Sequence, residues 1–148
     1  VKLLHRLGIG CPYVALLSAN ERVSEKMPSS VDAANLCKMA EEGCLPHAVY
    51  EGPIAFDVAM RPQAAVAKGI NSRVTGRVDL FLVPNIETGN CLGKAISYFG
   101  KGKSAVLAVG AAKPVVMPSR SASIEGKLAS VALALLSSCD FQQEGDIR

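Results

Sequence analysis

The sequence predicts an α/β fold, built from a mixed, largely parallel sheet with flanking helices. Two observations support this prediction. Short apolar runs of strand length alternate along the chain with segments of helical periodicity. The first of these runs, YVALLS from Tyr13 to Ser18, is continuously apolar, which is typical of a strand buried on both faces of a sheet.

Helices are predicted on both sides of this first strand. Residues 1–7 have the apolar spacing of a helix that stops at Gly8, so we expect the helix to begin upstream of the chain. After the strand, Ser29 and Asp32 have the spacing of a capping box, with the Ser29 hydroxyl as the cap. The helix that they open is predicted to run to about Glu42 and to stop at Gly43.

The middle of the chain predicts two more strands and two short helices. The strands are the short run at 48–50, ended by Glu-Gly-Pro, and the run DLFLVP at 79–84. A brief helix is predicted at 56–60, and a second begins at Pro62 and ends at Gly69.

The last third of the chain predicts two amphipathic helices with a strand pair between them. The apolar faces expected against a core are formed by Leu92, Ala95, Ile96 and Phe99 in one helix and by Leu128, Val131, Ala132 and Leu135 in the other. Residues 104–109 and 114–117 read as strands. Their connection is too short for a parallel crossover, so this pair is predicted to be antiparallel.

Composition excludes several classes of function. Hydrophobic residues make up 49% and charged residues 20% of the 148, a globular composition. The small net charge and the scarcity of aromatic residues argue against a nucleic-acid partner. The longest apolar run is too short to cross a membrane, so no membrane partner is expected.

The cysteines indicate a reducing compartment. Their number is odd, no CxxC pair occurs and no signal peptide heads the chain, so we expect free thiols in a cytoplasmic protein. His5 and His47 are isolated, and no metal site is predicted. Residues 140–148 read as a loosely held polar tail that follows a domain at 1–139.

Three junctions between a predicted strand and a predicted helix carry polar residues. They are GPIAFD at 52–57, VPNIETGN at 83–90 and MPSRSAS at 117–123. Ligands of open α/β sheets bind beyond the carboxyl ends of strands, at helix N-termini. Each junction alone also has a structural explanation, with Asn85 as a helix cap, Asp57 as a first-turn partner of the helix dipole and Arg120 as a solvated side chain. Together the three junctions favour one shared anion site.

At these junctions the chain resembles the phosphate acetyl/butyryltransferase family, and it is more similar to the butyryltransferase branch. The segments that carry the resemblance occur in family order and cover nearly the whole chain up to Leu136. They read VALLSANERVSEKMPSSVDAANLCKMAEEG, GPIAFDVAM, KGI, VDLFLVPNIETGN, GKAISYF and VVMPSRSAS. The combination of VPNIETGN with the later Ser-Arg pair is specific, whereas the shorter pieces are not.

The resemblance implies transfer of a short acyl group between coenzyme A and inorganic phosphate, with no metal or covalent cofactor. It also implies a two-domain chain about twice as long, related in fold to the isocitrate and isopropylmalate dehydrogenases and usually a homodimer. The present chain would be its C-terminal half, without the N-terminal half that forms the other wall of the cleft.

The resemblance also implies the site residues. Ser119 and Arg120 are the expected catalytic pair, with Arg120 on the phosphate or the oxyanion and Ser119 on the leaving thiolate or the phosphate. The expected substrate-binding residues are Asp57, Glu87, Gly89, Asn90 and Lys94.

Two positions depart from the family pattern. Ala122 replaces an aspartate that is common in butyryltransferase-like members, and Asn85 stands where many relatives carry aspartate. The aspartate at 122 is either a base for the CoA thiol or a helix cap. We favour the cap, because Glu125 lies three residues on and because Ser121 or Ser123 can replace the aspartate as a cap in this chain. The alternative function is a non-catalytic CoA- or phosphate-binding module, or a degenerate remnant of the family.

Overall fold

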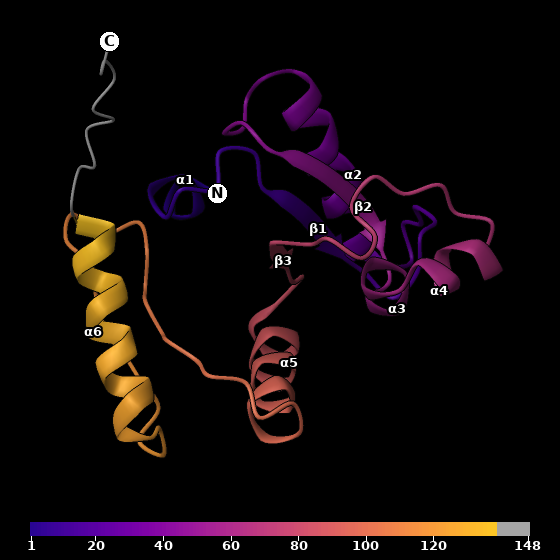
Figure 1. Cartoon of the computed structure of the whole chain (residues 1–148). Coiled ribbons are helices and arrows are strands. Elements are labelled where there is room, and N and C mark those ends of the chain that lie inside the picture. The colour runs from indigo at the N-terminus through magenta and orange to yellow at the C-terminus, as the bar shows by residue number, and fades with distance from the viewer. Residues whose placement is uncertain (139–148) are drawn as a thin grey trace, which may run out of the picture. The chain divides into compact units, whose positions relative to one another are not determined.

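The computed structural model describes residues 1–138, and the predicted tail at 140–148 and the thiol of Cys139 lie outside this range. The chain divides into two compact units (Figure 1). Unit 1 comprises Val1–His5 and Ile9–Leu92, and unit 2 comprises Arg6–Gly8 and Gly93–Arg148.

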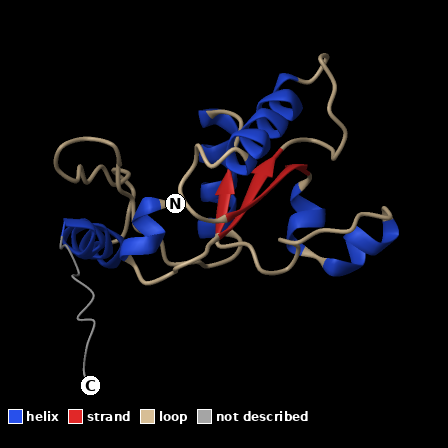
Figure 2. Ribbon diagram, turned by 90° about the horizontal axis from the view of Figure 1, so that it is seen from above, coloured by secondary structure: helices blue, strands red, loops and turns tan. Residues whose placement is uncertain are grey.

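Unit 1 contains a three-stranded parallel sheet with helices around it (Figure 2). The strands are β1 (Tyr13–Leu17), β2 (Val49–Ile54) and β3 (Leu80–Leu82), in the spatial order β2-β1-β3. Because β1 is central, it pairs with β2 along one edge and with β3 along the other. The expected α/β architecture with a parallel sheet is therefore confirmed.

Both faces of β1 are buried, as its continuous apolar sequence predicts. Val14 and Leu16 pack with Ala33 of α2 (Pro28–Glu41) on one face. Ala15 and Leu17 face the other side, in a cluster with buried residues of α3 (Phe56–Met60) and α4 (Pro62–Ala67). Alternation along the strand thus sends successive side chains into two separate cores.

Helix α2 begins earlier than the sequence predicts. Its N-cap is Met27, with Pro28 in the first turn, where a fixed φ and a missing N–H suit a helix start. The prediction that Ser29 is the cap is therefore wrong, and the Ser29 hydroxyl instead lies 2.9 Å from the Ser18 hydroxyl. The predicted stop is confirmed, because Gly43 follows the helix with a φ of 74°.

The other elements of unit 1 agree with the prediction to different degrees. Helix α3 has the expected bounds, and α4 is followed by Gly69 in a left-handed conformation, with a φ of 66°. Strand β2 runs on to Ile54 instead of ending at residue 50, and β3 is shorter than the predicted 79–84. A short helix, α1 (Lys2–Arg6), precedes Gly8 as expected.

Helix α5 (Ile86–Tyr98) begins in unit 1 and ends in unit 2, which also contains α6 (Ile124–Ser138). Between these helices, the predicted antiparallel pair is present only as an isolated bridge between Ala108 and Val115. Neither segment forms a strand of the sheet, so the mixed part of the predicted sheet is wrong. Val109 and Val115 are exposed there, and a two-stranded pair without a buried face is only marginally stable.

The apolar face predicted for α6 is not buried. Leu128, Val131 and Leu135 are exposed, while the buried residues of the helix are Ser130 and Ser137. Of the face predicted around α5, Ile96 within the helix and Phe99 just after it are likewise exposed, and only Leu92 packs against a core. Sequence periodicity identifies which side of a helix is apolar, but it does not identify what covers that side.

Candidate functional site: two helix starts and an ion-pair network

The first helix start lies just past the carboxyl end of β3. The Asn85 side-chain oxygen accepts hydrogen bonds from the Thr88 backbone N–H at 2.9 Å and from the Thr88 hydroxyl at 2.7 Å. The Asn85 carbonyl also accepts the first bond of the helix, from Gly89 N–H at 3.2 Å. Asn85 is therefore the N-cap of α5, the structural role considered for it in the sequence.

Gly89 allows a close contact between this helix and the strand before it. A Cβ atom at position 89 would lie 2.9 Å from Cγ2 of Val83, closer than such atoms approach without a shift. Glu87, Asn90 and Lys94 follow at spacings of three and four residues, so they share one face of α5. All three are exposed.

The second helix start carries the predicted catalytic pair. Ser119 and Arg120 lie in the exposed loop that precedes α6. The Ser119 hydroxyl lies 3.0 Å from the Ser121 hydroxyl and accepts from Ser121 N–H at 3.4 Å. Among the described residues, no group accepts a hydrogen bond from the Arg120 guanidinium. Its five N–H donors are thus open to an anion.

Ser123 is the N-cap of α6. Its hydroxyl oxygen accepts from Gly126 N–H at 3.1 Å, and its carbonyl accepts from Lys127 N–H at 3.0 Å. In this chain the cap is thus one of the two serines expected to replace an aspartate at position 122, and the role of an aspartate at 122 itself stays a prediction. The Glu125 backbone N–H and the Ser123 hydroxyl hydrogen-bond the Glu125 carboxylate, and these bonds lower its pKa.

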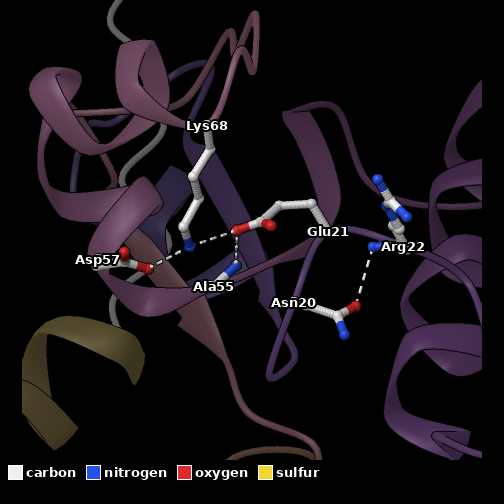
Figure 3. A network of polar contacts seen from close by, with 6 residues as sticks. All are labelled: Asn20, Glu21, Arg22, Ala55, Asp57 and Lys68. Carbon is white, nitrogen blue, oxygen red and sulfur yellow. Dashed lines mark hydrogen bonds and ion pairs between the residues drawn. The ribbon is translucent and has the colours of Figure 1, made fainter.

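Asp57 belongs to an ion-pair network. Its carboxylate accepts a hydrogen bond from Nζ of Lys68 at 3.1 Å, and the same ammonium lies 3.2 Å from Oε1 of Glu21 (Figure 3). Hydrogen bonding to Lys68 is the main cause that lowers the pKa of Asp57, and the bond to Asp57 is the main cause that raises the pKa of Lys68.

Lys68 and Glu21 were missed as site residues from sequence. The signal available was weak: Lys68 lies at the end of a short helix, and Glu21 lies in the loop after β1. The two residues are 47 positions apart, and no local pattern encodes that contact.

The structure thus places the predicted site residues in separate groups. In unit 1, Asp57 pairs with Lys68, while Glu87, Gly89 and Asn90 form the start of α5. In unit 2, Ser119 and Arg120 share the loop before α6, and Lys94 lies on the later part of α5. Within residues 1–138, no three His, Cys, Asp or Glu side chains are grouped so as to hold a metal ion. No helix in that range is both long and apolar enough to span a membrane.

The parallel sheet, with helix starts directly after β2 and β3, defines the chain as an α/β protein. Within that class, the chain belongs to the phosphate acetyl/butaryl transferase family, whose profile matches residues 1–135. The chain is 45% identical over 136 residues to a phosphate butyryltransferase of Clostridium acetobutylicum. It is 47% identical over 130 residues to a phosphate acetyltransferase of Rhizobium meliloti.

Solved structures agree with this assignment. A branched-chain phosphotransacylase from Enterococcus faecalis matches with a TM-score of 0.80 and 37% identity, over 92% of this chain and 49% of that one. The two sequence matches cover 92% and 88% of this chain, but only 45% and 41% of the relatives. The chain therefore spans less than half the length of these two relatives.

Proposed function

We propose that the chain is part of an acyltransferase that moves a short acyl group between coenzyme A and inorganic phosphate. Family membership supports the reaction class, and the loop at Ser119–Arg120 supports the site. This loop presents a hydroxyl and an exposed guanidinium next to the start of α6, where backbone N–H groups favour anions.

In the proposed reaction, a phosphate oxygen attacks the carbonyl carbon of an acyl-CoA thioester. The new C–O bond forms, negative charge gathers on the carbonyl oxygen, and the C–S bond then breaks to release the CoA thiolate and an acyl phosphate. Arg120 is the proposed donor to the phosphate or to the oxyanion, and Ser119 the proposed donor to the departing sulfur. The reaction needs no metal or covalent cofactor.

The remaining predicted residues are proposed to bind substrate. Glu87, Asn90 and Lys94 share an exposed face of α5, so one extended ligand can contact all three. Gly89 keeps the start of that helix close to the preceding strand. Asp57 is proposed to act at the same edge of the sheet, with its charge offset by Lys68.

We further propose that the active protein has two domains, with this chain at 1–139 as its C-terminal half and a dehydrogenase-like fold overall. The coverage of the relatives and the exposed apolar residues of α5 and α6 support a further covering surface. A homodimer is the proposed assembly. The free thiols of Cys11, Cys37, Cys44 and Cys91 support a cytoplasmic setting.

The test of the proposed function is phosphate-dependent release of CoA from butyryl-CoA, measured with a thiol reagent. A chain that carries both proposed halves is expected to release CoA, and the 148-residue chain alone to release little or none. CoA binding without turnover in the longer chain would favour a non-catalytic binding module instead.

The first mutational prediction concerns Arg120. In the longer chain, Arg120→Ala is expected to weaken binding of phosphate or CoA by about 1.5–3 kcal/mol, the range for hydrogen bonds to charged groups. Calorimetry measures this loss. Lys113→Ala, which removes another exposed cation of unit 2, is the matched control and should change affinity little. Equal affinities for the Arg120→Ala and unsubstituted proteins would exclude the assigned role.

A further inference from the structure

One ammonium group joins two segments of unit 1 that are distant in sequence. Nζ of Lys68 donates to Oδ1 of Asp57 at 3.1 Å and to Oε1 of Glu21 at 3.2 Å. The same Glu21 oxygen accepts a hydrogen bond from the backbone N–H of Ala55 at 3.4 Å. Figure 3 shows the three side chains converging on these contacts.

The joined segments follow the carboxyl ends of neighbouring strands. Glu21 lies in the loop at 18–27, which leads from β1 to α2, while Ala55 and Asp57 directly follow β2. Strands β1 and β2 are parallel, so both segments leave the sheet on the same side, at the carboxyl ends of the strands. This side of the sheet is called the substrate edge below. This is the edge where ligands of open α/β sheets bind.

The Glu21 end of the network is largely covered, whereas the Asp57 side chain is 55% exposed. The Glu21 side chain is only 17% exposed, and that of Lys68 is 38% exposed. Figure 3 also shows the Arg22 guanidinium directed away from the network, and Arg22 N–H donates to the Asn20 side chain at 3.0 Å. Anchoring Glu21 therefore restrains the part of the loop next to Arg22.

Lys68 also sets the charge of this edge. Glu21 and Asp57 contribute two carboxylates, and Lys68 is the cation that contacts both of them. Without it, two negative groups would face an edge that must accept phosphate or the phosphates of CoA. Repulsion between like charges would then weaken the binding of an anionic substrate there.

We propose that Lys68 is a positioning residue for acyl transfer: it holds the loop at 18–27 against the segment after β2 and offsets the carboxylates of Glu21 and Asp57 at the substrate edge. This inference rests on the proposed function for its kinetic consequence. Its structural consequence is independent of that function and is measured separately.

The structural arm uses amide hydrogen exchange on the 148-residue chain. Lys68→Met is expected to speed exchange of the Ala55 N–H by about tenfold or more, because the acceptor Glu21 is released. Lys68→Arg keeps the charge and should retain protection. Lys38→Met is the matched control, since Lys38 pairs with Glu42 on the exposed surface of α2. An unchanged exchange rate of the Ala55 N–H in Lys68→Met would overturn the proposal that Lys68 holds the loop at 18–27.

The kinetic arm uses the chain with both proposed halves. Lys68→Met is expected to raise the KM for phosphate about fivefold with little change in kcat, because repulsion acts equally on bound substrate and transition state. Adding Glu21→Gln removes one carboxylate and should restore most of the KM, a rescue that a general loss of folding would not show. An unchanged KM in Lys68→Met would refute the positioning role. If the unsubstituted enzyme is inactive, the proposed function is refuted. Hydrogen exchange then decides by itself whether Lys68 holds the loop at 18–27.

Discussion

At position 122 the side chain is a single methyl group beside the serine that caps α6. The helix N–H groups are satisfied without position 122, because Ser123 accepts from Gly126 N–H. Ala122 contributes only its own backbone N–H, which donates to the Ser119 carbonyl at 3.0 Å. An aspartate here would therefore stand outside the cap, two residues after Arg120. The two roles that an aspartate at 122 could have, a helix cap and a catalytic base, make different predictions for this position.

Ala122→Asp tests the role of a base. In the chain with both proposed halves, we expect turnover to rise about tenfold or more, since a positioned general base contributes about 10²–10⁴ in rate. The base form is the carboxylate, so this gain should disappear as the pH falls through the pKa of the new acid.

Thermal unfolding provides the control for this prediction. Ala122→Asp should leave the melting temperature nearly unchanged, whereas Ser123→Ala, which deletes the cap, should cost about 1 kcal/mol of stability. If Ala122→Asp instead stabilised the protein and left turnover unaltered, the aspartate would be a helix cap and not a base.

Among the elements, β2 shows how position in a sheet overrides local sequence signals. Gly52 and Pro53 read as a terminator, yet both lie inside the strand. β2 is an edge strand, so the missing N–H of Pro53 is tolerated there. Gly52 is required by the approach of β1, because a Cβ at this position would lie 2.5 Å from Cβ of Leu16 and 2.8 Å from its carbonyl oxygen.

Gly52→Ala is accordingly expected to be strongly destabilising. The added methyl group meets the backbone of β1 and cannot be relieved by a side-chain rotation, so we expect a loss of about 1–3 kcal/mol or more in the free energy of unfolding. Urea denaturation followed by circular dichroism measures it. Gly93→Ala is the matched control, because a Cβ there meets nothing within 4 Å and alanine favours helix. Similar stabilities for the two variants would contradict the close approach.

The sequence predicted those parts of the fold that local pattern determines. The buried strand β1, the short helices α3 and α4 and the loop that holds Ser119 and Arg120 follow from apolar runs, prolines and glycines. Other features do not follow from local pattern. The extent of β2 and the contact of Lys68 with Glu21 depend on residues that are distant in sequence, and the cap at Ser123 depends on where the helix starts to within one residue. Those features required the tertiary structure.

For the whole molecule, the distribution of apolar surface differs between the two units. In unit 1, the buried clusters lie on both faces of β1. In unit 2, large apolar side chains remain exposed: Tyr98, Phe99, Val109, Met117, Ile124, Leu128, Val131 and Leu135. On α6, Ser130 is buried instead and accepts from Val106 N–H at 2.9 Å. Exposed apolar groups of this extent mark an interaction surface.

When the 148-residue chain is alone, the proposed covering half is not there to bury this surface, so we expect the chain to self-associate through α6. Replacing Leu128 and Leu135 together by glutamine should lower the mass measured by light scattering toward the 15.5 kDa of one chain. Val66→Gln is the control, because Val66 is 80% exposed but lies in unit 1. Association that survives the double substitution would place the proposed homodimer contact elsewhere.

The strand order also constrains how the chain folds while it is being synthesised. The central strand β1 leaves the ribosome first, with both of its edges unpaired, and its last partner is far downstream. Tyr13 N–H bonds to the Asp79 side chain, 66 positions later. At the usual 5–20 residues per second, roughly 3–13 s pass before that partner exists. During this interval the most buried strand of the sheet has an unpaired edge that can pair with other nascent chains, and early docking of α2 covers one of its faces.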